Sequence, residues 1–162
     1  MITDDLLKEL ALEQHIPLND VFMKDDPPNK IKYGGYIVNL DDEESGRGGT
    51  HWTCLWFPRY INKPIIYFDS FGFIIPQSLI NWIKNKGGYY KNSKILCNDK
   101  QIQNVDTGGC GIYSLYFLDF VSKHPLTANS ITLLNNFNKK WDTDTKNNLN
   151  LLKKYAPYYA ES

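Results

Sequence analysis

The residues best suited to covalent chemistry lie in one short segment of this sequence. Residues 103–111 read QNVDTGGCG, which places Cys110 between a glycine-bearing loop and a long apolar stretch. We expect Cys110 to begin a helix, where unpaired backbone N–H groups and the positive end of the helix dipole stabilise a thiolate. Gly109 and Gly111 are expected to leave the backbone beside the sulfur open to a substrate chain. The segment therefore predicts a nucleophilic thiol at Cys110.

A histidine and an aspartate lie upstream of this thiol. His51 precedes an apolar strand expected at 52–57, and Asp69 ends the next one, expected at 64–69. Their short connection predicts that the two strands pair, which would bring the carboxylate to the imidazole and hold its tautomer. Alone, the histidine is better explained as a structural residue, and the aspartate is equally well explained as a turn former. Together with Cys110 they predict thiol-based acyl transfer, with His51 as base and Asp69 as its orienting acid.

Acyl transfer from a peptide also needs hydrogen-bond donors for the oxyanion of its tetrahedral intermediate. Gln103 lies seven positions before Cys110, near enough for a loop to fold its side-chain amide back beside the sulfur. The backbone N–H of Cys110 is the expected second donor. We interpret Gln101 as a solvated loop residue and Gln103 as the candidate oxyanion donor.

The remaining cysteines and histidines predict no metal site and no cofactor. Three cysteines at irregular spacing form neither a disulfide framework nor a zinc ligand set. Cys54 and Cys97 lie in short apolar runs, and we interpret both as small buried hydrophobic residues. The sequence contains neither paired-histidine ligand spacing nor a phosphate-binding loop.

Length and composition predict one globular α+β domain over residues 1–162. Hydrophobic residues make up 42% of the chain and charged residues 22%. Eighteen basic and eighteen acidic residues give zero formal net charge, so there is no bulk attraction to nucleic acid or to a membrane surface. No apolar run is long enough to span a bilayer, and the acidic start is unlike a signal peptide. We expect a soluble protein of a reducing compartment.

Periodicity predicts a small central mixed sheet flanked by helices. The helix that begins at Cys110 is apolar on nearly all sides, which is typical of a buried central helix. The acidic, glycine-rich segment 41–49 is expected to be a solvated loop, with a flap that lines the substrate as the minority interpretation. The other expected elements are a helix at 4–14, a loop at 22–28, strands at 35–40 and 94–97, a helix at 75–86, and two covering helices after 127.

Three motifs resemble the active-site blocks of the adenovirus maturation protease and of the related SUMO-specific and other ubiquitin-like-protein proteases. They are GTHW at 49–52, YFDSFG at 67–72 and QNVDTGGCGIY at 103–113, and the resemblance runs from about Gly34 to Phe120. It implies a papain-like α+β fold and a cysteine protease in which a Cys–His pair is oriented by an acid. Carried over by motif, the nucleophile is Cys110, the base His51, the orienting acid Asp69 and the oxyanion donor Gln103.

The resemblance also implies a substrate. The expected function is cleavage of viral capsid and other structural precursors at glycine-containing sites during virion maturation, in the virion and in the viral factory of the host cytoplasm. Trp52 and Gly109 are expected to form narrow subsites that admit glycine. SUMO proteases usually carry an acidic residue where Gly109 stands, which favours the viral branch.

Two other functions remain open at this point. One is an isopeptidase acting on the Gly-Gly tails of ubiquitin or a SUMO-like modifier, and the other is a catalytically silent binding protein of the same fold. Some adenovirus-type enzymes need an activating peptide and DNA. The zero net charge gives no reason to expect dependence on DNA, and no residue indicates a peptide partner.

Overall fold

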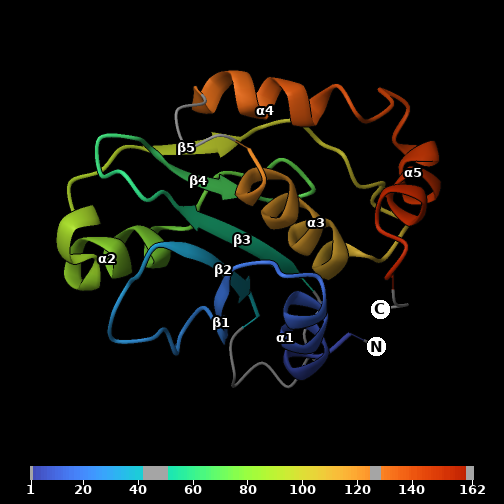
Figure 1. The fold of residues 1–162 in the computed structure, drawn as a ribbon. Coiled ribbons are helices and arrows are strands. Elements are labelled where there is room, and N and C mark those ends of the chain that lie inside the picture. Colours follow the sequence, from blue (N-terminus) through green and yellow to red (C-terminus); the bar gives the residue numbers. More distant parts are fainter. Residues whose placement is uncertain (1, 42–50, 125–128, 160–162) are drawn as a thin grey trace.

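A computed structural model of the chain describes residues 2–41, 51–124 and 129–159. A five-stranded mixed sheet in the order β1-β2-β3-β4-β5 lies at the centre of the molecule (Figure 1). The outer pairs β1–β2 and β4–β5 are parallel, and the inner pairs β2–β3 and β3–β4 are antiparallel. The strands are β1 (Leu18–Met23), β2 (Gly34–Asn39), β3 (Trp52–Phe57), β4 (Ile65–Phe68) and β5 (Ile95–Asn98).

Helices cover both faces of this sheet (Figure 1). Residues of α1, α3, α4 and α5 pack on one face, whereas α2 and a short 3-10 helix pack on the other. The helices are α1 (Asp4–Glu13), α2 (Gln77–Lys86), α3 (Cys110–Ser122), α4 (Ser130–Asn138) and α5 (Asn148–Tyr155), with 3-10 helices η2 (Gly88–Tyr90) and η3 (Thr145–Asn147). The expected α+β fold is confirmed. None of these helices, which all lie in the described ranges, is long and apolar enough to cross a membrane.

Strand β3 is buried on both faces and joins the two halves of the core. Trp52, Cys54 and Trp56 contribute to the core on the α3 side. Leu55 and Phe57 contribute to the core on the α2 side. This alternation follows from the two-residue period of a strand, as the sequence predicts. The end of β3 at Trp52 is therefore held firmly on both sides.

Helix α3 is the buried central helix that the sequence predicts. Most of its side chains are buried, and it packs against β3 and β2. The Phe68 ring at the end of β4 stacks on the Phe117 ring at a centroid distance of 4.6 Å. Because α3 is fixed to the sheet by apolar contacts on nearly all sides, its first residue, Cys110, has a defined place beside the strand ends.

The expected loop at 22–28 is partly wrong, because Phe22 and Met23 belong to strand β1. Asn19 and Asp20 are poor strand formers, so the local sequence gives little indication of a strand. Parallel pairing with β2 supplies the missing hydrogen bonds. Tertiary pairing thus overrides local propensity. The predicted loop at 41–49, and the flap interpretation with it, lies outside the described residues except for Asp41.

Candidate active site

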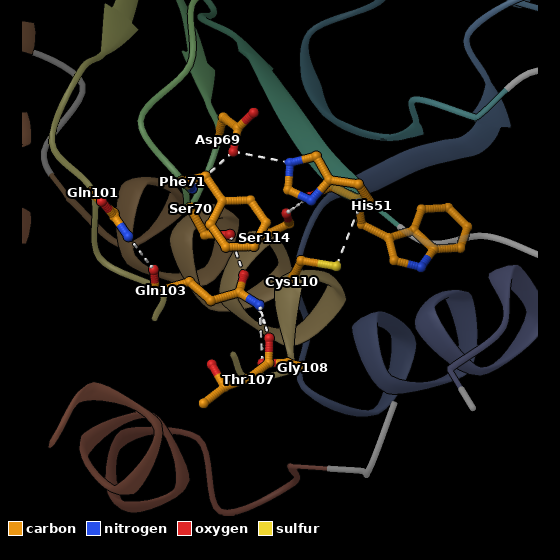
Figure 2. A network of polar contacts seen from close by, with 11 residues as sticks. His51, Asp69, Ser70, Phe71, Gln101, Gln103, Thr107, Gly108, Cys110 and Ser114 are labelled. Atoms are coloured by element: carbon orange, nitrogen blue, oxygen red, sulfur yellow. Dashed lines mark hydrogen bonds and ion pairs between the residues drawn. The ribbon is translucent and has the colours of Figure 1, made fainter. Parts of the chain in front are cut away.

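The pairing of β3 with β4 brings His51 to Asp69. The two strands are antiparallel with Cys54 opposite Phe68, so the start of β3 lies beside the end of β4. His51 immediately precedes β3 and Asp69 immediately follows β4. Their side chains meet, with His51 Nε2 2.9 Å from Asp69 Oδ1 (Figure 2). The predicted strand pairing is confirmed, and it places the carboxylate on the imidazole.

The Asp69 carboxylate is buried and held in place by a second donor. The backbone N–H of Phe71 donates to Asp69 Oδ1 at 2.8 Å. The Phe71 ring stacks on the His51 ring, with centroids 4.8 Å apart and planes inclined by 29°. The turn after β4 therefore holds the imidazole both at its edge, through Asp69, and on its face, through Phe71.

Cys110 is the first residue of α3 and lies beside the start of β3. Its side chain is buried, and the backbone N–H of Trp52 donates to its sulfur at 3.3 Å (Figure 2). The preceding residue, Gly109, has φ +100°, a left-handed conformation that favours glycine. The helix N-terminus and the Trp52 N–H both favour negative charge on the sulfur.

His51 is electrostatically coupled to both neighbours. Burial lowers the pKa of His51, but hydrogen bonds and charge interactions with Asp69 and Cys110 outweigh it and raise the pKa to about 9. His51 Nε2 is taken by Asp69, while Nδ1 is buried and has no hydrogen bond to a described nitrogen or oxygen. That leaves Nδ1 as the ring nitrogen able to share a proton with the sulfur of Cys110. At neutral pH we therefore expect an imidazolium in contact with a carboxylate and a sulfur.

The side chain of Gln103 is almost fully buried and faces the loop that leads into α3. Its Nε2 donates to the carbonyls of Thr107 at 2.7 Å and Gly108 at 3.1 Å. Its Oε1 accepts a hydrogen bond from the Ser70 hydroxyl at 2.6 Å (Figure 2). Both amide hydrogens are thus directed at the residues just before Cys110. An oxyanion at this place would replace one of the two carbonyls as their acceptor.

Trp52 and Gly109 adjoin the sulfur, but their surroundings are those of packed residues. The Trp52 side chain is 4% exposed and belongs to the core. A Cβ on Gly109 would point toward Leu149, Tyr113 and Tyr159. Their roles in substrate binding stay predictions.

The predicted opening beside Gly111 is not what the structure shows. A Cβ on Gly111 would lie 3.1 Å from Ile2 and 3.3 Å from Trp52. Glycine at this position allows α3 to pack closely against β3 and the N-terminal segment.

Two residues that touch the candidate site were not singled out from the sequence, namely Ser70 and Phe71. Both lie in the YFDSFG motif directly after Asp69, and that position was the available signal. The other cysteines lie elsewhere, with Cys54 fully buried in the core and Cys97 half-buried on β5. Over the described ranges, no three His, Cys, Asp or Glu residues form a group able to hold a metal ion.

Comparisons with known proteins agree with this arrangement. No family model matches the chain. The chain is 26% identical over 110 residues to a protein named "Protease" from bovine adenovirus 7, an alignment that spans 62% of this chain and 52% of that protein. This match confirms the resemblance to adenovirus-type proteases that the motifs predict.

Crystal structures of the ASFV pS273R protease show a similar fold. One superposes with a TM-score of 0.53 at 19% identity, covering 81% of this chain and 62% of that one. The selenomethionine form superposes with a TM-score of 0.51 at 17% identity, covering 83% and 65%. The expected adenovirus protease-like α+β fold is thereby confirmed. This chain spans about half the length of the adenovirus relative and less than two thirds of the ASFV protease.

Proposed function

We propose that this chain is a cysteine endopeptidase with Cys110 as nucleophile, His51 as general base and acid, and Asp69 as the residue that orients His51. One observation carries the proposal. A histidine whose Nε2 is bound by a buried carboxylate adjoins a cysteine sulfur that lies at a helix N-terminus and accepts a backbone N–H. Those are the parts that thiol-based acyl transfer requires.

The chemistry follows from these positions. The Cys110 sulfur attacks the carbonyl carbon of the scissile peptide bond and forms a C–S bond, while the carbonyl oxygen becomes an oxyanion. The His51 imidazolium gives its proton to the leaving amine as the C–N bond breaks, which leaves a thioester. His51 then takes a proton from water, whose hydroxide attacks the thioester and releases a carboxylic acid and the thiolate. In this scheme Gln103 Nε2 and the Cys110 N–H donate to the oxyanion.

Relatives support proteolysis in a viral setting, because the sequence relative and the solved structures are all named as viral proteases. We infer that the substrates are capsid or other structural precursors of the same virus, cut during virion maturation in the virion or the host cytoplasm. A glycine beside the scissile bond suits this site. Cys110 is only 6% exposed. A substrate must therefore bring its carbonyl close to packed backbone, and a residue without a side chain does so most easily.

The test is a map of new protein termini in a digest of the precursor proteins, read by mass spectrometry. The wild-type protein should release fragments with glycine next to the cut, and Cys110→Ala should release none. Cleavage that ignores glycine would contradict the specificity. Labelling of Cys110 by a ubiquitin or SUMO probe, without cleavage of the precursors, would favour an isopeptidase instead. Absence of hydrolysis across a broad peptide library would favour a silent binding protein.

The pH dependence of hydrolysis is expected to report the proton on His51. The pKa of His51 is raised to about 9, so the imidazolium persists through neutral pH and is lost as the pH rises through about 9. The proposed acid then lacks its proton, and kcat/KM should fall along that alkaline limb. The stability that this group contributes follows the same sign: it is full below about pH 6.5 and is lost as the pH rises through about 9.

Asp69→Asn is the matched variant for this measurement. It keeps the shape of the side chain but removes the carboxylate, the larger of the two influences that raise the pKa of His51. The alkaline limb of kcat/KM, and the midpoint of the His51 titration followed by NMR, should both move to lower pH. An alkaline limb that stays in place in Asp69→Asn would show that the carboxylate does not hold the proton on His51.

A further inference from the structure

Ser70 adjoins Asp69, yet no step of the proposed chemistry uses it. It is fully buried, and its hydroxyl donates to Gln103 Oε1 at 2.6 Å. Its backbone carbonyl accepts the N–H groups of Ile102 at 2.8 Å and Gln103 at 2.9 Å. Ser70 therefore binds Gln103 twice, once through the backbone and once through the end of its side chain.

The side-chain contact decides which way the amide of Gln103 points. A glutamine amide has an acceptor end and a donor end of nearly the same shape, so packing alone does not distinguish the two orientations. The Ser70 hydroxyl takes the acceptor end, which directs Nε2 toward the carbonyls of Thr107 and Gly108 (Figure 2). Those two carbonyls belong to the loop immediately before Cys110.

This orientation matters most when a substrate is bound. In the free protein the two loop carbonyls also favour the donor end of the amide. Once an oxyanion displaces one of them, the loop contributes less, while the Ser70 contact on the opposite end is unaffected. A donor whose direction is fixed before charge develops stabilises the transition state more than one that must reorient.

We propose that Ser70 is a positioning residue that aims the Gln103 amide at the oxyanion formed on the substrate of Cys110. This inference rests on the proposed function, in which Gln103 is an oxyanion donor. Asp69 and Ser70 then have separate tasks from adjacent positions, since one holds the base and the other holds the donor.

A double-mutant cycle between Ser70→Ala and Gln103→Ala tests this role. Gln103→Ala should lower kcat by about two to three orders of magnitude, the usual effect of losing one oxyanion donor. Ser70→Ala should lower kcat by about tenfold, with KM changed by less than about twofold, because it removes one neutral hydrogen bond. The double variant should match Gln103→Ala within about twofold, because the serine has no amide left to orient.

Alkylation of Cys110 by iodoacetamide separates positioning from a structural effect. The reaction uses the thiolate but forms no oxyanion, so Ser70→Ala should alkylate at the wild-type rate within about twofold. Ser114→Ala is the matched control. Ser114 is also fully buried, and its hydroxyl donates to the Trp52 carbonyl at 3.3 Å. Any loss of kcat in Ser114→Ala should persist in full when Gln103→Ala is added.

Two results would overturn the role of Ser70. One is a loss of kcat in Ser70→Ala that persists at full size in the Gln103→Ala background. The other is a parallel loss of alkylation, which would show that the turn around Asp69 has collapsed. If Ser70→Ala does not fold, Ser70→Cys replaces it, since a thiol fills the same space but is a weak donor. Failure of the proposed function would look different, because the wild-type protein itself would neither hydrolyse peptides nor alkylate rapidly at Cys110.

Discussion

Replacing Cys110 with alanine is expected to abolish peptide hydrolysis, lowering kcat/KM by about four orders of magnitude or more. The substitution removes the only atom in the proposed site that forms a covalent bond with the substrate, and the catalytic residues act as a unit. The fold should survive. The main loss is the Trp52 N–H bond to the sulfur, a contact whose removal costs about 1 kcal/mol. Steady-state hydrolysis and urea unfolding of the same preparation measure the two effects.

Cys97→Ala is the matched control for the thiol. Cys97 is half-buried on β5 and lies outside the proposed site. Its substitution should leave kcat/KM within about twofold of the wild-type value, since surface changes away from such features are usually mild. Hydrolysis by Cys110→Ala within tenfold of the parent, or an equal loss in Cys97→Ala, would show that a different residue is the nucleophile.

The second large effect is expected for His51→Ala, which should lower kcat/KM by about three to four orders of magnitude. It removes both the proton donor for the leaving amine and the cation beside the sulfur. Alkylation of Cys110 near neutral pH should therefore slow as well, because the thiolate loses its counter-charge. Rates of hydrolysis and of iodoacetamide alkylation, measured side by side, follow both roles.

The stability and the ranking of the histidine variants give further checks. His51→Ala leaves the buried Asp69 carboxylate with the Phe71 N–H as the remaining printed partner, so a modest loss of stability is expected. His124→Ala is the control, because its ring contacts the Phe120 carbonyl at the far end of α3. Asp69→Asn should cost less activity than His51→Ala, since the Cys–His pair remains. The reverse order would contradict the assignment of base and orienting acid.

The strand pairing at the candidate site could be predicted because it is local in the chain. His51 and Asp69 flank two apolar strands joined by a short connection, and such strands pair antiparallel with their outer ends together. Helix α3 was equally predictable, since its apolar residues run through the whole helix after a glycine. These features follow from neighbouring residues, whose spacing alone limits how they can be arranged.

Long-range contacts settled the features that were not predicted. Strand β1 contains residues with low strand propensity and forms because β2 pairs with it. Gly111 lies against Trp52 and Ile2, from distant parts of the chain. The direction of the Gln103 amide depends on Ser70, which lies 33 positions earlier. No local pattern encodes these contacts.

By itself, the amino-acid sequence determined which side chains can do chemistry, their order along the chain and the elements that begin or end beside them. Only the tertiary structure decided where the unused donors and acceptors point: His51 Nε2 to Asp69, the Trp52 N–H to the sulfur, and Gln103 Nε2 to the loop before Cys110. The physical reason is burial. A buried polar group must find its partner wherever packing brings one within reach, and packing is a property of the whole fold.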